Sequence, residues 1–160
     1  MKKAILSLIL LVAISFSITG CNFESNDIRA PQELTIFNST MSLEQYDFDY
    51  LEIECNSNDS VMIYDYDDMI ELFTLADALV LTKSYEGYDM PEDFDYLCSV
   101  TFFRQGKDGR PDVSYYFYVS TIGEICYRRR RLAASDVYYK AESTAILNEV
   151  NRLIELYNQS

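Results

Sequence analysis

Apolar and polar residues alternate in several stretches of the chain, as expected for strands with one buried face. Between Tyr50 and Cys55 the apolar side chains fall on one side and two glutamates on the other. The polar turn at 56–59 then leads into a second apolar stretch. The strands predicted by these patterns cover residues 50–55, 61–64, 97–104, 113–119 and 124–130, with 137–140 as a last edge strand. We expect 97–104 and 124–130 to flank 113–119.

Two other stretches repeat their apolar residues at steps of three and four, which predicts helices. Asp65 would cap the first helix, assisted by Asp68, and Ser143 would cap the second, which ends near Asn158. The first stripe is Met69, Leu72, Phe73, Ala76, Leu79 and Val80, and the second is Ile146, Leu147, Val150, Leu153, Ile154 and Tyr157. The order β-β-α-β-β-β-α predicts an α+β domain with about five antiparallel strands and both helices on one face.

The N-terminal stretch has a different pattern. Lys2 and Lys3 precede an apolar run of about 13 residues, from Ala4 to Phe16. That run is shorter than the roughly 20 apolar residues of a transmembrane helix, and its order of charge, apolar run and small residues is typical of an export signal.

The run leads into Ile18-Thr19-Gly20-Cys21. This tetrad resembles the lipobox of bacterial lipoproteins. The resemblance implies that Cys21 receives a diacylglyceryl thioether and that signal peptidase II recognises Ile18, Thr19 and Gly20 and cuts after Gly20. An ordinary secretory signal with a chance cysteine, or an uncleaved anchor, stays open as an alternative.

On this interpretation residues 1–20 are a lipoprotein signal peptide, 21–33 are the lipidated cysteine and a flexible tether, and 34–160 are a single α+β domain. The arrangement of elements resembles small lipoprotein domains of Gram-positive bacteria. The lipobox implies a lipid-anchored protein on the extracytoplasmic face of the cell membrane, and the resemblance in arrangement implies no activity. A single acyl chain binds membranes weakly, so durable attachment needs the two or three chains expected on Cys21.

Charge narrows the possible partners. Without Lys2 and Lys3 the chain keeps 11 basic residues against 26 acidic ones, a formal charge of −15. Nucleic acid is therefore excluded as an expected partner, because such binding depends on basic side chains that neutralise phosphates. Attraction of cations or of a basic protein fits better. The sequence has no histidine, which removes the commonest general base and zinc ligand, and we predict no metal or cofactor.

With Cys21 lipidated, Cys55, Cys98 and Cys126 remain, so at most one intramolecular disulfide can form. Cys98 and Cys126 are expected about two strand spacings apart, too far for a disulfide. The sequence contains no C-x-x-C motif. We therefore expect all three to be small core residues without chemistry.

Two further stretches are candidate sites. Tyr85–Tyr96 places five acids among four aromatic residues around Gly87 and Pro91, and we expect a loop that could hold a hard cation or stack on a sugar or peptide. Arg128, Arg129, Arg130 and Arg131 form the one basic run in the chain. Strand alternation would divide them between two faces, where they could pair with the chain's own acids or contact an anionic partner.

Three functions follow from these features. The first is a non-enzymatic binding or accessory module of the cell envelope that contacts another envelope protein. The second is a receptor for a small ligand or cation that uses the Tyr85–Tyr96 loop. The third is a glycan hydrolase with paired carboxylates, which would need two carboxyl groups at glycosidase separation in one cleft.

Overall fold

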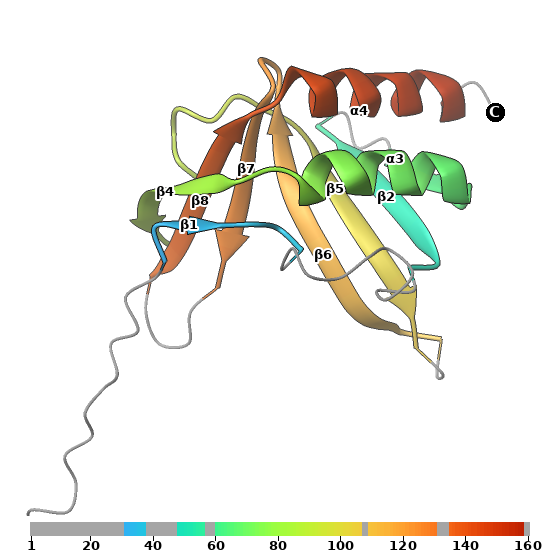
Figure 1. Cartoon of the computed structure of the whole chain (residues 1–160), viewed down its shortest axis with the longest axis horizontal. Coiled ribbons are helices and arrows are strands. Elements are labelled where there is room, and N and C mark those ends of the chain that lie inside the picture. The colour runs from blue at the N-terminus through green and yellow to red at the C-terminus, as the bar shows by residue number, and fades with distance from the viewer. Residues whose placement is uncertain (1–30, 38–47, 57–59, 107–108, 131–134, 159–160) are drawn as a thin grey trace, which may run out of the picture. The chain divides into compact units, whose positions relative to one another are not determined.

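The computed structural model describes residues 31–37, 48–56, 60–106, 109–130 and 135–158. They belong to one compact unit that runs from Pro31 to Ser160. The described residues form an α+β domain with one eight-stranded antiparallel sheet and two helices (Figure 1). Cys21 and the three residues before it lie outside the described residues.

The sheet has the strand order β1-β4-β8-β7-β6-β5-β2-β3, and every neighbouring pair is antiparallel. The strands are β1 (Glu33–Leu34), β2 (Tyr50–Cys55), β3 (Ser60–Ile63), β4 (Leu81–Gly87), β5 (Tyr96–Gln105), β6 (Pro111–Ser120), β7 (Glu124–Arg129) and β8 (Asp136–Glu142). The predicted meander is confirmed, because β5 and β7 flank β6.

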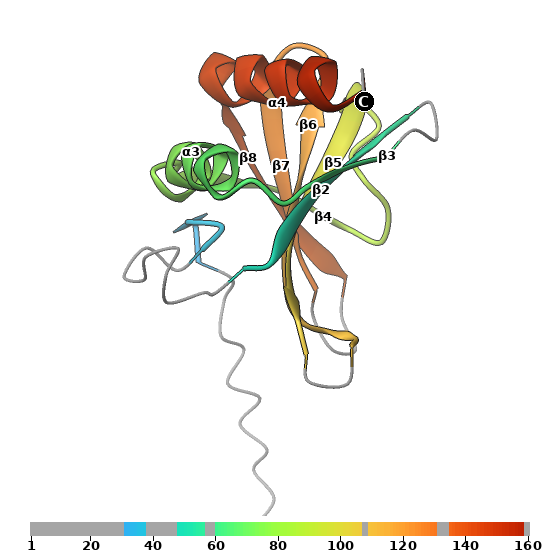
Figure 2. The same cartoon turned by 90° about the vertical axis from the view of Figure 1, so that its right-hand side faces the viewer.

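The helices are α3 (Tyr66–Asp77) and α4 (Thr144–Tyr157). They contact each other and lie side by side over the same face of the sheet (Figures 1 and 2). The predicted caps are confirmed: the Asp65 carboxylate accepts hydrogen bonds from the amides of Asp67 and Asp68, at 3.0 and 3.2 Å, and the Ser143 hydroxyl accepts one from the amide of Ile146 at 3.2 Å. Each cap satisfies amide groups that the first helical turn leaves unpaired.

The sheet face under the helices, here called the inner face, carries the main core. Leu51 lies opposite both Ile63 and Phe102, and Phe102 in turn lies opposite Tyr115. The Phe73 ring of α3 approaches the Phe102 ring to 6.2 Å. Rings from distant parts of the chain, Phe37, Phe48, Phe73, Phe102 and Tyr115, gather here with centroids 4.5–6.3 Å apart. Burial of these rings ties the segment before the first long strand to α3 and the sheet.

The predicted strand count and order were wrong, since eight strands follow the order β-β-β-α-β-β-β-β-β-α. Strand β4 was missed: residues 81–84 carried no prediction and residues 85–87 were expected to begin a loop, but the strand pairs with β1 and β8. Strand β8 is not an edge strand, because it lies between β4 and β7. The positions of β4 and β8 in the sheet depend on hydrogen bonds to strands distant in sequence. A local pattern of apolar and polar residues does not indicate such pairing.

The first helix is also shorter than predicted. It ends with Ala78 as its C-cap, so Leu79 and Val80 lie beyond it and Val80 is 55% exposed. The Asp68 carboxylate does not supplement the cap. It faces α4, where it accepts hydrogen bonds from Arg152 and Tyr157.

Candidate functional site

The acidic, aromatic stretch expected as a loop over Tyr85–Tyr96 is partly strand. Tyr85, Glu86 and Gly87 belong to β4, and Tyr96 begins β5. The segment between them, residues 88–95, crosses the outer face of the sheet, on the side away from α3 (Figure 2). Its Phe94 is 7% exposed and packs with Cys126 and Tyr138, two residues of that face.

Lys140 fixes this segment to the sheet. Its ammonium group lies 3.2 Å from an oxygen of Asp93 and 3.1 Å from one of Glu124, and 5.7 Å from the centre of the Phe94 ring. Burial would lower the pKa of Lys140, but the hydrogen bonds to Glu124 and Asp93 outweigh burial and raise it. The lysine therefore stays charged between two carboxylates and an aromatic ring.

These contacts already occupy carboxylates of segment 88–95 that were candidates for binding a cation. Asp93 pairs with Lys140, and Asp95 accepts a hydrogen bond from the hydroxyl of Thr121. Within the described residues no group of three or more Cys, Asp or Glu side chains is arranged to hold a metal ion. The segment thus serves as a cover over the outer face.

The uncovered part of the outer face carries an aromatic surface that the sequence patterns did not single out. Tyr50 stacks on Phe103, with centroids 4.8 Å apart and planes 17° from parallel, and lies 5.7 Å from Tyr64. Tyr64 is 64% exposed and Met62 is 45% exposed. These four residues, here called the outer patch, lie on β2, β5, β3 and the residue after β3, on the side of the sheet that faces away from the helices. Aromatic residues at the outward positions of predicted strands were the signal that could have found them.

Two carboxylates border the outer patch. Glu52 lies directly opposite Met62, and Glu54 lies two residues further along β2 on the same face. Glu52 accepts a hydrogen bond from the hydroxyl of Ser60 at 3.2 Å. In the described part of the chain, neither glutamate has a cation within ion-pair distance. Burial, and then the negative charge of Glu52, raise the pKa of Tyr50.

The arginine run divides as strand alternation predicts. Arg128 points to the outer face, where its Nε donates to the Tyr116 hydroxyl at 3.4 Å and lies 3.7 Å from a carboxylate oxygen of Asp136. Arg129 borders a cavity on the opposite face, and Arg130 is exposed just after β7. Arg131 lies outside the described residues. Of the three described arginines, Arg128 and Arg129 lie on opposite faces, and the role of the run as a partner contact stays a prediction.

The cavity beside Arg129 measures about 610 Å³ and lies where β6 and β7 separate. The two strands pair only at Tyr118 with Cys126 and at Val119 with Ile125, and Figure 1 shows them diverging beyond these pairs. One wall is apolar and the other carries hydroxyls and charge. The lining residues are Pro31, Glu33, Leu34, Thr35, Ile36, Val80, Tyr115, Tyr127 and Arg129.

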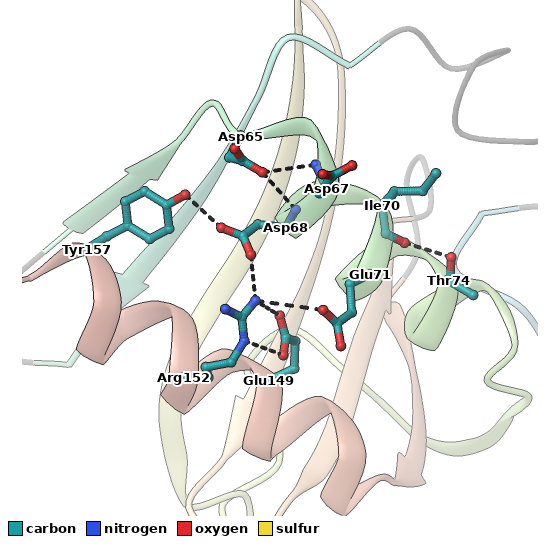
Figure 3. Close-up of polar contacts among 9 residues, drawn as sticks. All are labelled: Asp65, Asp67, Asp68, Ile70, Glu71, Thr74, Glu149, Arg152 and Tyr157. Carbon is teal, nitrogen blue, oxygen red and sulfur yellow. Dashed lines mark hydrogen bonds and ion pairs between the residues drawn. The ribbon is translucent and has the colours of Figure 1, made fainter.

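A polar cluster joins the two helices (Figure 3). Arg152 bonds Glu149 through Nε at 2.9 Å and Nη2 at 2.5 Å, and Asp68 through Nη2 at 2.6 Å. The Tyr157 hydroxyl donates to the other oxygen of Asp68 at 2.7 Å. Burial would raise the pKa of Asp68, but the bonds from Arg152 and Tyr157 outweigh it and lower that pKa. The cluster keeps the Asp68 carboxylate ionised and clamps α3 to α4.

The three domain cysteines lie in the core region of the sheet. Cys98 and Cys126 are fully buried, and Cys55 is partly buried. Burial raises the pKa of Cys98 and of Cys126 to about 12. Cys98 lies opposite Val119 whereas Cys126 lies opposite Tyr118, so these two thiols occupy opposite faces of the sheet. The expectation that they do not bridge each other agrees with this register.

None of the described helices is long and apolar enough to cross a membrane. The comparisons with known proteins add no further constraint on this site. The chain matches no protein family model, no curated protein and no solved structure.

Proposed function

We propose that this chain is a lipoprotein, held by acyl chains on Cys21 at the extracytoplasmic face of the cell membrane, whose domain is a non-enzymatic binding module of the envelope. The observation that carries the proposal is the tetrad Ile18-Thr19-Gly20-Cys21, which follows a short apolar run behind two lysines. The compact unit begins at Pro31, ten residues after Cys21. Such a spacing keeps a bound partner close to the membrane.

The outer patch supports the binding role and suggests the chemistry of the partner. Its exposed tyrosine and methionine lie beside Glu52 and Glu54, in a chain with a net charge of −13. Aromatic faces next to carboxylates attract Lys and Arg side chains, through cation–π contacts and charge. Strand β3 is the last strand of the sheet in the described residues, so its free edge can add a further strand. The partner fitted by these features is a basic, extended segment of another envelope protein.

Replacement of Cys21 by Ser tests the anchor. In cells labelled with radioactive palmitate, the native chain should take up label and sediment with membranes, whereas Cys21→Ser should take up none. Inhibition of signal peptidase II should leave the labelled chain longer by the uncleaved signal segment. Equal labelling of the two chains would contradict the proposed attachment.

Crosslinking in intact cells tests the binding role. A Tyr64→Ala, Glu54→Gln variant should lose a crosslinked partner that the native chain retains, and the crosslinked partner peptide should be rich in Lys and Arg. Tyr88→Ala is the matched control, because Tyr88 is 77% exposed and lies outside the outer patch. The contrary result is full crosslinking in the patch variant and loss of the partner in an Arg129→Ser, Arg130→Ser variant. It would place the partner contact at the arginines and contradict the binding role of the outer patch.

The cavity beside Arg129 favours a second candidate function, a receptor for a small amphipathic anion. Its apolar wall at Leu34 and Ile36 would take an alkyl chain, and Arg129 would pair with a carboxylate. Octanoate is a suitable probe. A rise in the melting temperature with octanoate that is lost in Arg129→Gln would support this function, and an unchanged melting temperature would exclude a fatty carboxylate as its ligand.

A further inference from the structure

The pairing of β2 with β5 brings two cysteines together. Cys55 and Cys98 are direct partners in the register of this antiparallel pair, so both side chains emerge on the same face. The next pair along, Asn56 and Leu97, is joined by a hydrogen bond of 3.1 Å from the amide of Asn56 to the carbonyl of Leu97. Hydrogen-bonded and non-hydrogen-bonded pairs alternate in such ladders, which makes Cys55 and Cys98 a non-hydrogen-bonded pair.

That class of pair suits a disulfide. Directly opposed residues in non-hydrogen-bonded positions have Cα atoms about 4.5 Å apart and their side chains close together. Disulfides span Cα separations of roughly 4.4–6.8 Å. Cys126 is no competitor, because it lies on the other face of the sheet, three strands from β2.

From this register we infer that Cys55 and Cys98 are a redox-active pair that closes to a cross-strand disulfide when the domain meets a disulfide oxidant. The inference rests on the proposed function for its setting, since an extracytoplasmic domain is exposed to such oxidants. The bond would join the two strands at the end of β2, next to the turn that leads to β3. It would enclose β3, α3, β4 and segment 88–95 in one covalent loop.

The difference in burial sets the order of the two chemical steps. Cys55 is partly buried, whereas Cys98 is fully buried and burial raises the pKa of its thiol to about 12. The thiolate of Cys55 attacks one sulfur of a disulfide such as oxidised glutathione, forming a mixed disulfide and releasing one glutathione thiolate. The sulfur of Cys98, losing its proton, then attacks the Cys55 sulfur and releases the second glutathione. Two protein thiols are oxidised, one glutathione disulfide is reduced to two thiols, and both protons end on glutathione.

Thiol counting on the full chain tests the inference. Membranes that contain the chain are treated with oxidised glutathione, denatured in detergent and alkylated with a maleimide mass tag, before or after reduction. The chain has four cysteines. With Cys21 lipidated, we expect one tag before reduction, on Cys126, and three tags after it. An unlipidated Cys21 adds one tag to both samples, so failure of the proposed anchor changes the absolute number and leaves the difference of two unchanged.

Variants assign the bond. Cys126→Ser should keep the difference of two tags, and Cys55→Ser should abolish it. Because Cys55 is only partly buried, this variant tests the pairing even where Cys98→Ser fails to fold. The oxidised chain should melt at a higher temperature than the reduced one, by up to roughly 15 °C for a loop of this length.

Three results would overturn the inference. The first is an equal number of tags before and after reduction. The second is a stable glutathione adduct on Cys55, which would show that Cys98 cannot resolve the mixed disulfide. The third is loss of the two-tag difference in Cys126→Ser, which would place Cys126 in the bond.

Discussion

Arg152 is the residue whose removal should most weaken the contact between the two helices. In Arg152→Ala the carboxylates of Glu149 and Asp68 lose the cation that both of them bind (Figure 3). These side chains are 7% and 16% exposed. Two nearly buried carboxylates would then remain close together without a counter-charge, and each would carry a desolvation cost that Arg152 now offsets.

The size of the effect follows from burial. Breaking a fully buried ion pair costs about 3–5 kcal/mol, whereas an exposed pair contributes about 1 kcal/mol or less. The Arg152 side chain is 43% exposed, which places the cluster between these limits. We therefore expect the variant to lose about 2 kcal/mol of unfolding free energy, equivalent to a fall in melting temperature of roughly 6–10 °C.

Low pH should reduce the difference in unfolding free energy between the native chain and Arg152→Ala. The pKa of Asp68 is lowered in the folded native chain, so its stabilising effect is complete above the pKa of the unfolded chain, about 3.9, and is lost as the pH falls through the lower folded value. In Arg152→Ala, protonation of Asp68 instead relieves its repulsion with Glu149. The gap in unfolding free energy should therefore shrink below about pH 4.

Urea denaturation followed by circular dichroism measures these free energies. Asn151→Ala is the matched control, because Asn151 is an exposed neighbour on α4, and it should change stability by less than about 0.5 kcal/mol. A loss for Arg152→Ala no larger than that of the control would refute the clamp. So would a loss that stays constant from neutral pH to about pH 3.

Three further predictions concern the covered face, the core and a turn. Lys140→Ala should lower stability by about 1–2 kcal/mol and speed hydrogen exchange in residues 88–95, because the lysine bonds that segment to the sheet; unchanged exchange there would contradict this role. Tyr139 is fully buried, and its hydroxyl has no hydrogen-bond partner in the described part of the molecule. Tyr139→Phe should therefore leave the free energy of thermal unfolding unchanged or raise it by up to about 1 kcal/mol, and a loss of stability would contradict this. Gly123 has a φ of 85°, and a Cβ there would lie 3.4 Å from the carbonyl oxygen of Ser143. Gly123→Ala should therefore lower the free energy of thermal unfolding by about 1–2 kcal/mol, and a variant as stable as the native chain would contradict this.

The sequence patterns succeeded where one face of an element is buried and the other is open. Strands β2 and β5 alternate for this reason, and α4 was predicted from its cap at Ser143 to its end at Asn158. Strand β8 shows why others were misjudged. Val137, Tyr138 and Tyr139 are all fully buried, and Phe94 of segment 88–95 packs on Tyr138. Because residues of both faces are buried, no alternation marks the interior position of this strand.

Strand β4 was missed for the opposite reason. Of its seven residues only Leu81 is buried, and the strand is held by backbone pairing with β1 and β8. The helix clamp was likewise hidden, since Asp68 and Arg152 are 84 positions apart. The division of the arginine run was predictable, because it depends on strand alternation alone. The aromatic positions of the outer patch were visible in the sequence, but the contacts among them, like the cysteine pair, required the register of β2 with its neighbours.

The mass of the N-terminal peptide of the mature chain tests the central proposal most directly. The chain is extracted from membranes, digested and analysed by mass spectrometry. We predict a peptide that begins at Cys21 and carries a diacylglyceryl group on its sulfur. A peptide that begins elsewhere, or an unmodified Cys21 in the membrane fraction, would contradict the lipid anchor and, with it, the proposed place of this domain at the envelope.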